Sequence, residues 1–437
     1  MSELRRTLGP VSLFGLGVGY VISGMYFGWN LGLPEGGPYG MLVATALVSA
    51  MYVAFVLTYA ELACALPRAG GAFVYATRAF GPAVGLFAGV GQWVELVLAP
   101  PAIAAAIGAY LHLLVPSVPA LAFAVLAYVV FTAVNLRGVA LSAGLELVMT
   151  ALAVAELLVF AAVALPHFSA ARFREDALPH GWAGVVPAIP YAIWFYLGIE
   201  GLANVAEEAR DPSRDLPRGF GAAIVTLVAL ALLVLFGAVG VAGWRAVVFP
   251  PGDTTPSDSP LPLALGVVFG RAHPLYHLVV GVGLFGLLAS FHGLLLAAGR
   301  ATFEFGRLGW APAILGRVDA RTGTPVAALV ANAALGIVAL VTGKTSELIT
   351  LAVLGALAMY GTSILAMLRL RKAEPGLPRP FRTPLAPALP IAAAIAVAGA
   401  LVAMAISTPW LAAIYAGVVV CAYGLFAFVP AEKRRAA

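Results

Sequence analysis

Charged residues are scarce in this chain of 437 residues, since Asp, Glu, Lys and Arg together make up only 10%. Soluble domains average about a quarter, and their surfaces need polar groups that this sequence does not supply. Hydrophobic residues make up 62%, and the mean hydropathy is +0.98. The shortage of charge excludes a soluble globular protein, a disordered chain and a nucleic-acid binder, and it predicts a protein of the lipid bilayer.

Cysteine and lysine are nearly absent as well. The two cysteines, Cys64 and Cys421, lie in apolar runs, so we expect no disulfide framework. The sequence has no P-loop, no Cys/His cluster with metal-ligand spacing and no nucleophile–base pair. The apolar run after Arg5 and Arg6 has no small-residue cleavage site, so it predicts a first span rather than a signal peptide. We therefore expect no catalytic residue, no metal, no cofactor and no enzyme activity.

Long apolar segments, in contrast, fill almost the whole chain. Twelve of them are long enough to cross a bilayer, at about 10–34, 38–66, 82–114, 118–136, 143–166, 183–206, 217–244, 270–304, 324–342, 346–369, 387–406 and 409–429. The alternation of a β-barrel is missing, and no soluble domain is inserted between the segments. The pattern predicts an all-α integral membrane protein with about 12 transmembrane helices, in a single domain over residues 1–437.

The basic residues predict the orientation of these helices. If the N-terminus is cytoplasmic, 20 of the 25 Lys and Arg residues fall in inside loops and termini, and 5 fall outside. Positive charge collects on the cytoplasmic side of membrane proteins. We therefore expect a multi-pass protein of the cytoplasmic membrane with both termini in the cytoplasm.

Two of the predicted spans contain residues that interrupt a helix. Glycines crowd residues 15–28 of the first span, and residues 187–201 of the sixth contain Pro187, Pro190 and Gly198. Backbone groups freed by proline and glycine are tolerated at membrane depth only inside protein or along a cavity. Glycine also serves close helix packing, but interruptions at matching positions of two halves are typical of transporters with inverted repeats. The pattern favours a binding site at these two interruptions.

Two acids lie in the predicted spans without a basic partner. Glu95 is in the third span and Glu200 adjoins the interruption of the sixth, and neither span offers Arg or Lys one turn away. Placing such a group in a bilayer costs roughly 2.5–3.5 kcal/mol. We interpret the two acids as a site for an ammonium group or a proton; the alternative is a protonated acid bonded in the core. Trp194 and Tyr196 adjoin Glu200, where aromatic faces can attract an ammonium ion or act as gates.

Four further ionisable residues have less distinctive positions. Glu61 lies near the cytoplasmic end of the second span, which favours a structural ion pair or gate over substrate contact. Glu156 either relays protons or forms a hydrogen bond to a neighbouring helix. A lone buried histidine such as His292 is more often a hydrogen-bonded core residue than a proton carrier. Glu146 lies near a span end and is expected to reach the interface.

Two ordered motifs resemble those of amino acid–polyamine–organocation transporters. The first includes Leu66-Pro67-Arg68-Ala69-Gly70-Gly71-Ala72-Phe73-Val74-Tyr75, and the second runs from Gly198 to Gly219. The resemblance covers the whole chain and implies a LeuT-like fold. Helices 1 and 6 are broken in that fold, residues 10–166 and 183–369 form the inverted repeats, and residues 387–429 add two helices. Substrate is then expected at the broken parts of helices 1 and 6.

Within this superfamily the sequence is most similar to ethanolamine permeases. The similar stretches include Ser23–Leu33, Pro190–Gly201 and Ala289–His292. Amino-acid carriers of the superfamily usually have glycine where this chain has Ile22, and bare amides there hold the substrate carboxylate. An isoleucine crowds that anion site, which suits a cation without a carboxylate. A lysine in the fifth span, used by some proton-driven relatives, is missing.

We therefore expect a secondary transporter that imports a small amino alcohol, most specifically ethanolamine, with proton coupling. The alternative is an amino-acid permease or exchanger of the same superfamily. The substrate-binding residues expected are Ser23, Gly24, Met25, Glu95, Trp194, Tyr196, Gly198, Glu200 and Phe291. The candidates for carrying a proton are Glu200, Glu95, Glu156 and His292, with Glu200 linking proton load to closure of the sixth span.

Overall fold

The computed structural model describes residue 6 and residues 8–68, 70–137 and 142–430. Apart from one isolated bridge between Leu8 and Ala209, the regular structure of these residues is helical. The principal helices are α1 (Pro10–Gly19), α2 (Ser23–Tyr26), α3 (Leu33–Ala65), α5 (Pro82–Leu114), α6 (Ala120–Leu136), α7 (Ser142–Ala164), α9 (Val185–Trp194), the 3₁₀ helix η5 (Ile199–Glu208), α10 (Pro212–Ala242), α13 (Pro274–Arg307), α14 (Val326–Val341), α15 (Thr345–Ala373), α16 (Ala388–Ser407) and α17 (Pro409–Ala427).

The twelve predicted segments all coincide with helices. Among the described residues, nine helical stretches are long and apolar enough to cross a membrane, and α1, α6 and α14 are shorter apolar helices. The first segment leads directly into the second, and they are separated at Gly37, whose φ of 62° interrupts the helix. Proline in the first turn starts several spans, since its missing N–H costs nothing there; examples are Pro82, Pro212 and Pro274.

Short helices between the spans and at their ends were not predicted. They are η1 (Trp29–Gly32), α4 (Ala72–Phe80), η3 (Leu165–His167), α8 (Ala170–Arg174), η4 (Gly181–Gly184), α11 (Trp244–Val248) and α12 (Pro260–Phe269). The long polar connection at 245–269 thus contains two of them. Each is too short or too polar to stand out from composition, because short helices depend on contacts with the bundle.

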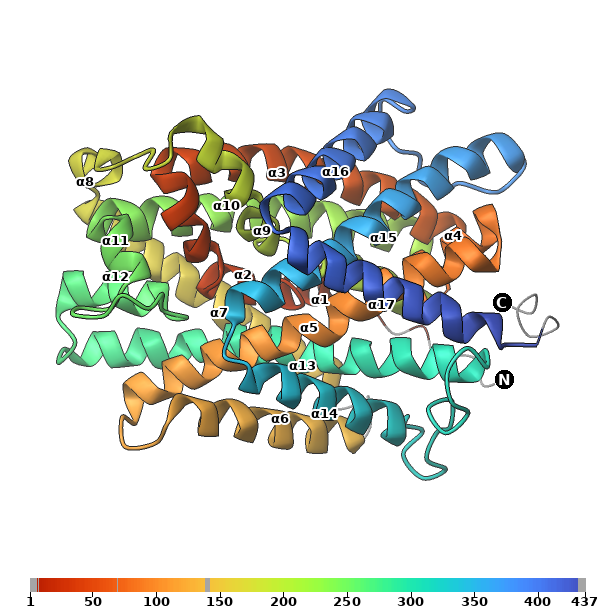
Figure 1. The fold of residues 1–437 in the computed structure, drawn as a ribbon, viewed down its shortest axis with the longest axis horizontal. Coiled ribbons are helices and arrows are strands. Elements are labelled where there is room, and N and C mark those ends of the chain that lie inside the picture. The colour runs from red at the N-terminus through yellow and green to blue at the C-terminus, as the bar shows by residue number, and fades with distance from the viewer. Residues whose placement is uncertain (1–5, 7, 69, 138–141, 431–437) are drawn as a thin grey trace.

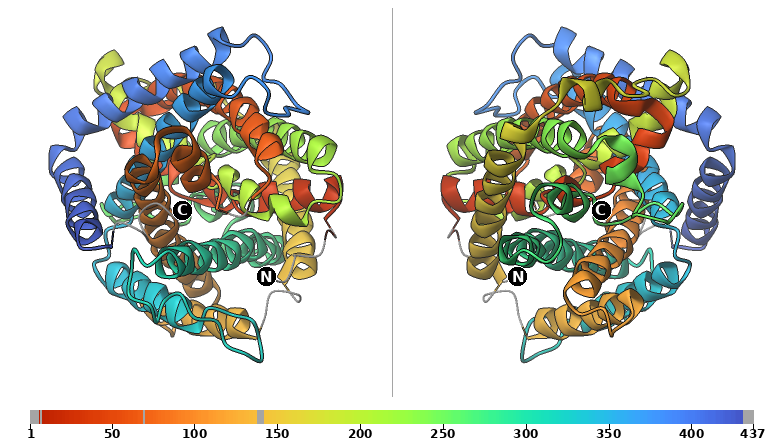
Figure 2. Two further views of the ribbon diagram at one scale, coloured as in Figure 1. Left: turned by 90° about the vertical axis from the view of Figure 1, so that its right-hand side faces the viewer. Right: turned by 90° about the vertical axis from the view of Figure 1, so that its left-hand side faces the viewer.

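The long helices run mainly along the longest axis of the molecule (Figure 1). Helices α5 and α15 cross the middle of the bundle and pack closely on each other, whereas α16 and α17 lie on its outer edge (Figure 2). The backbones of α5 and α15 touch at Gly91 and Gly355, where a Cβ on Gly355 would lie 2.5 Å from the carbonyl oxygen of Gly91. Small residues allow this approach, and it brings Glu95 of α5 next to α15.

Candidate substrate site

The two interrupted spans meet at the centre of the bundle. The first is α1 followed by α2, which are joined by hydrogen-bonded turns at Tyr20 to Ile22, and the helical conformation is lost at Phe27 and Gly28. The second is α9 followed by η5, with Gly198 between them at a φ of 102°. A Cβ on Gly24 would collide with the carbonyl oxygen of Trp194, and one on Gly198 would lie 3.2 Å from the carbonyl oxygen of Tyr20. Glycine is therefore required where the two interruptions face each other.

Glu95 of α5 and Glu200 of η5 face each other beside these interruptions. Both side chains are buried, with 0% and 1% of the residue exposed, and their carboxyl groups lie close enough to interact electrostatically. Neither forms an ion pair in the described part of the chain, and both oxygens of Glu95 lack a hydrogen-bond donor there. Two carboxylates repel each other unless a proton or another cation sits between them. The pair is therefore a candidate cation site.

Tyrosines from two other helices complete the polar wall of the acid pair. The Tyr360 hydroxyl of α15 donates to Oε2 of Glu200 at 2.8 Å, and the Tyr52 hydroxyl of α3 donates to that of Tyr360 at 3.2 Å. The Tyr196 hydroxyl is 2.6 Å from the Ser49 hydroxyl, and its ring packs on Tyr52 with centroids 5.1 Å apart. Tyr196 was predicted from the sequence, whereas Tyr360, Tyr52 and Ser49 were not. They lie in ordinary apolar helices, and no local signal marks them.

The other expected contacts lie at differing distances from the acid pair. The Ser23 amide donates to the Ser290 hydroxyl, and the Met25 carbonyl accepts from Trp29. The ring of Trp194 packs edge-on against Phe27, and its indole N–H has no acceptor among the described residues. At Gly24, between Ser23 and Met25, the first span contacts the backbone of Trp194 in the sixth.

Phe291, in contrast, is not brought to this region. Its ring packs edge-on against Tyr128 and Phe131 of α6, with centroids 4.9 and 5.9 Å apart. Successive residues of an α-helix project about 100° apart, so Ser290 contacts the first span while Phe291 contacts α6. The structure therefore offers no support for Phe291 as a substrate contact.

Two further buried acids lie on α7. Glu156 accepts a hydrogen bond from the Tyr26 hydroxyl at 2.6 Å, which ties α7 to α2. Glu146 was expected to reach the interface, but only 1% of it is exposed, and its Oε2 lies 3.3 Å from Nδ1 of His292. That expectation was wrong because α1 and α13 cover this face of α7. His292 is thus paired with Glu146, a partner that could not be predicted from the positions of the two residues in the sequence.

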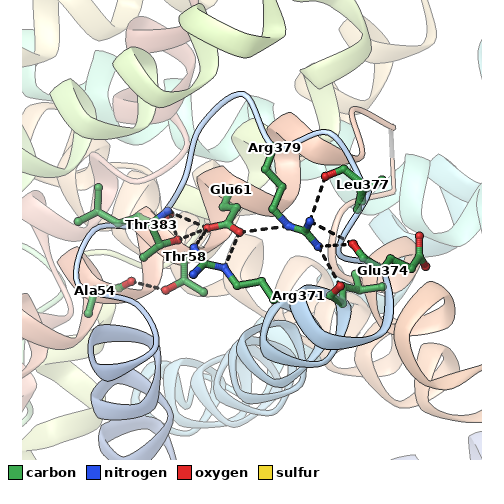
Figure 3. Close-up of polar contacts among 10 residues, drawn as sticks. Ala54, Thr58, Glu61, Arg371, Glu374, Leu377, Arg379 and Thr383 are labelled. Atoms are coloured by element: carbon green, nitrogen blue, oxygen red, sulfur yellow. Dashed lines mark hydrogen bonds and ion pairs between the residues drawn. The ribbon is translucent and has the colours of Figure 1, made fainter.

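Glu61 forms the ion pair that was predicted for it (Figure 3). Its carboxylate accepts from both Nε and a terminal nitrogen of Arg371, and Arg379 lies 3.5 Å away. The amide and hydroxyl of Thr383 also donate to Glu61, at 2.7 and 2.8 Å. The residue joins α3, α15 and the loop before α16, and it lies apart from the acid pair.

Comparisons with known proteins agree with this architecture. A family model described as amino acid permease matches residues 8–432. An uncharacterised transporter of Rhizobium meliloti is 30% identical over 385 residues, which is 85% of this chain and 80% of the relative. The branched-chain amino acid permease BcaP of Bacillus subtilis is 25% identical over 89% of this chain and 86% of its own length. The methylthioribose transporter of the same bacterium is 24% identical over 90% of this chain and 87% of its own length.

The family match covers nearly the whole chain, and many helices are long enough to cross a membrane. Both findings indicate a transporter and not an enzyme. The chain is a multi-pass membrane transporter of a small molecule, and it belongs to the amino acid permease family within the amino acid–polyamine–organocation superfamily.

Proposed function

We propose that this permease imports a small amino alcohol, ethanolamine, across the cytoplasmic membrane in symport with protons. The observation that carries the proposal is the buried pair of Glu95 and Glu200, which has no basic partner among the described residues. Charge attraction strengthens where water is excluded, so the two carboxyl groups would attract a small ammonium ion. The proposal includes cytoplasmic termini and the two inverted repeats, 10–166 and 183–369.

Each expected contact has a role in this proposal. Glu95 pairs with the ammonium, because both of its oxygens lack donors. Trp194 and Tyr196 shape the pocket on the side of the sixth span. Backbone carbonyls of Ser23–Met25, in the short helix α2, and of residues 197–199 accept hydrogen bonds from the amine and the hydroxyl, since the last carbonyls of a helix lack partners within it. Gly24 and Gly198 let the two interruptions approach.

The first span supports a substrate without a carboxylate. Ile22 is fully buried at its interruption, and a branched side chain there takes room that an anion would need. An amino acid would also bring its carboxylate near Glu95 and Glu200, and like charges in a buried site repel. An amino alcohol presents the ammonium without that penalty.

An amino-acid substrate is the second candidate, and the names of the relatives favour it. Two proteins that cover most of this chain at 25–26% identity are named branched-chain amino acid permeases. In that case a carboxylate group must find donors near Ile22, and the acid pair serves to hold the substrate amine or a proton.

Uptake into proteoliposomes tests the proposal directly. Labelled ethanolamine and labelled alanine are offered in parallel, with and without an inward proton gradient. Gradient-stimulated ethanolamine uptake that excess alanine does not inhibit is expected. Alanine uptake with ethanolamine inert would show an amino-acid permease instead.

The role of Glu95 is tested by the Glu95→Gln variant. Losing one charge from an ion pair in a buried site is expected to weaken ethanolamine affinity by about tenfold or more. The matched control is Glu347→Gln, since Glu347 pairs with Lys344 at the surface and its loss should leave affinity unchanged. Unchanged affinity in Glu95→Gln would contradict the assignment.

A further inference from the structure

A groove of about 570 Å³ lies between α14 and the loop 308–325 that precedes it. Residues between Val326 and Ala334 of α14 form its floor, and three of the five that line it are alanines. Ile314, Arg317 and Val318 of the loop form its wall. Helix α14 (cyan) lies beside α6 (orange) at the lower edge of both views in Figure 2. The groove therefore belongs to the outer surface of the bundle and not to its centre.

The surface of this groove is exposed and mostly apolar. Ile314 and Val318 are 59% and 52% exposed, and Val330 of α14 is 48% exposed. With 16 residues, α14 is about 24 Å long, whereas the hydrocarbon core of a bilayer is about 30 Å thick. Ile314 and Val318 extend the apolar surface of the helix toward the loop. Because the chain is a membrane protein, lipid acyl chains are the molecules that meet this surface.

The loop wall of the groove is held in place by the end of α13. The backbones of Gly306 and Gly316 are in contact, because a Cβ on either glycine would collide with the backbone of the other. The ring of Trp310 packs edge-on against Phe426 of α17, with centroids 5.0 Å apart. Arg317 directly follows Gly316, so its backbone is already positioned. A ligand of Arg317 therefore does not have to order this loop, which lowers the entropic cost of binding.

Arg317 supplies the positive charge of the groove. Its guanidinium forms no ion pair within the described part of the chain. The other charged group of the groove is Asp319, whose carboxylate accepts from the amides of Arg321 and Thr322 at 3.0 and 2.9 Å and from the Thr322 hydroxyl at 3.1 Å. These donors hold the carboxylate within its own loop and offset part of its charge. A guanidinium presents a planar fork of donors that matches a phosphate group.

We propose that this groove binds one anionic phospholipid, with its phosphate on Arg317 and an acyl chain along the alanines of α14. A phospholipid is favoured over a soluble anion, because the groove is apolar except at Arg317 and Asp319. A headgroup with net negative charge is favoured over a zwitterionic one, whose own cation competes with Arg317 for the phosphate. The bound lipid joins the loop 308–325 to α14. The inference is independent of which substrate the permease carries.

Native mass spectrometry of the purified full-length protein tests the headgroup contact. Phosphatidylglycerol and phosphatidylcholine with the same acyl chains are titrated in parallel. Wild type is expected to bind phosphatidylglycerol about tenfold more tightly, and Arg317→Gln is expected to lose this preference, since a hydrogen bond between charged groups contributes about that factor. Arg317 is exposed, so the variant should fold.

The matched control is Arg321→Gln, because Arg321 is exposed in the same loop but does not line the groove. It should retain the preference for phosphatidylglycerol. Equal binding of the two lipids by wild type would overturn the proposal. So would a preference that survives in Arg317→Gln, or one that is lost equally in both variants, since equal loss indicates attraction to the whole basic surface.

The position of the acyl chain is tested by Ala331→Phe, which fills the middle of the groove. This variant is expected to lose tight binding of phosphatidylglycerol although Arg317 is still present. Leu335→Phe is the control, since Leu335 is 47% exposed on the same helix and does not line the groove. Unchanged binding in Ala331→Phe would contradict the position of the chain on α14. If Ala331→Phe does not fold, the comparison of Arg317→Gln with Arg321→Gln decides.

Discussion

At the scale of single residues, the partner of a buried acid decides its role. Glu61 lies against two arginines, Glu146 against a histidine, and Glu95 against another acid. All three are almost completely buried. An arginine partner stabilises a permanent charge, a histidine partner can exchange a proton, and an acid partner invites a cation. In our proposals Glu61 thus serves structure and Glu95 serves substrate binding.

Removing the Glu61 carboxylate is expected to destabilise the protein. In Glu61→Ala, Arg371 and the nearly buried Arg379 lose their counter-ion, and leaving a buried charge unpaired costs about 3 kcal/mol. Thermal unfolding in detergent measures the effect. The control is Glu374→Ala, because Glu374 pairs with Arg78 at the surface, where an ion pair contributes about 1 kcal/mol or less. Equal losses of stability in the two variants would mean that the Glu61 ion pair contributes no more to stability than a surface ion pair.

The Tyr360 hydroxyl is expected to matter for substrate affinity. Tyr360→Phe removes the donor to Glu200, and a hydrogen bond to a charged group contributes about 1.5–3 kcal/mol, or roughly tenfold or more in affinity. Substrate competition in proteoliposomes measures the change. Tyr423→Phe is the control, since Tyr423 donates to the carbonyl of Ala83 at the edge of the bundle. If Tyr360→Phe binds substrate as tightly as wild type, the hydrogen bond to Glu200 does not contribute to substrate binding.

At the scale of helices, the approach of α5 to α15 positions Glu95. Gly91 and Gly355 let the two backbones touch, and a Cβ on Gly355 would lie 3.1 Å from the amide of Glu95. The interruptions of the first and sixth spans depend on glycine in the same way. Close approach, rather than helix propensity, explains why glycine stands at these places in long helices.

Gly355→Ala is therefore expected to damage both stability and transport. Overpacking a tight helix contact costs about 1–3 kcal/mol, and the displaced α5 would move Glu95. Gly361→Ala on the same helix is the matched control, because its nearest neighbour would be Val397 at an ordinary contact distance of 3.5 Å. Melting temperature and uptake should both fall in Gly355→Ala and stay near wild type in Gly361→Ala. The opposite order would show that the α5–α15 contact is adaptable.

At the scale of the whole molecule, contacts between distant loops close the bundle around its centre. Leu8 exchanges backbone hydrogen bonds with Glu208 and Arg210, and Asn30 donates to the carbonyl of Ser257. Next to Ser257, Asp258 accepts a hydrogen bond from Thr345 at the start of α15. Glu95, in the centre of the bundle, is 0% exposed to solvent. A substrate can therefore reach it only if some of these contacts open.

Asp258 is expected to make stability depend on pH. Burial raises the pKa of its carboxyl from 3.8 to about 6, against the opposing effect of the Thr345 hydroxyl. Between these values the folded state binds more protons than the unfolded chain, so the free energy of unfolding falls as pH rises and the loss is complete above about pH 6.

Asp258→Asn should remove this slope and be about 1–3 kcal/mol more stable than wild type near pH 7. Thermal unfolding across pH measures it. Asp253→Asn in the same loop is the control. The Thr255 amide lowers the pKa of exposed Asp253, so removing the Asp253 charge should not increase stability. Parallel pH profiles for wild type and Asp258→Asn would contradict the expectation.

Much of this architecture could be read from local sequence. The twelve apolar segments, the interruptions within residues 15–28 and 187–201, and the superfamily were predicted and are confirmed by the helices and the family match. The short helices of the connections were missed because they are stabilised by contacts with the bundle. The substrate and the coupling ion remain proposals.

Composition and order along the chain determined that this protein is a helical membrane transporter, because hydrophobic length and helix-breaking residues act locally. Only the tertiary structure decided which acids meet. Glu95 faces Glu200 across 105 residues, Glu146 faces His292 across 146, and Phe291 turns away from both. Such pairings depend on how helices rotate and pack against one another, and no stretch of sequence within one helix contains that information.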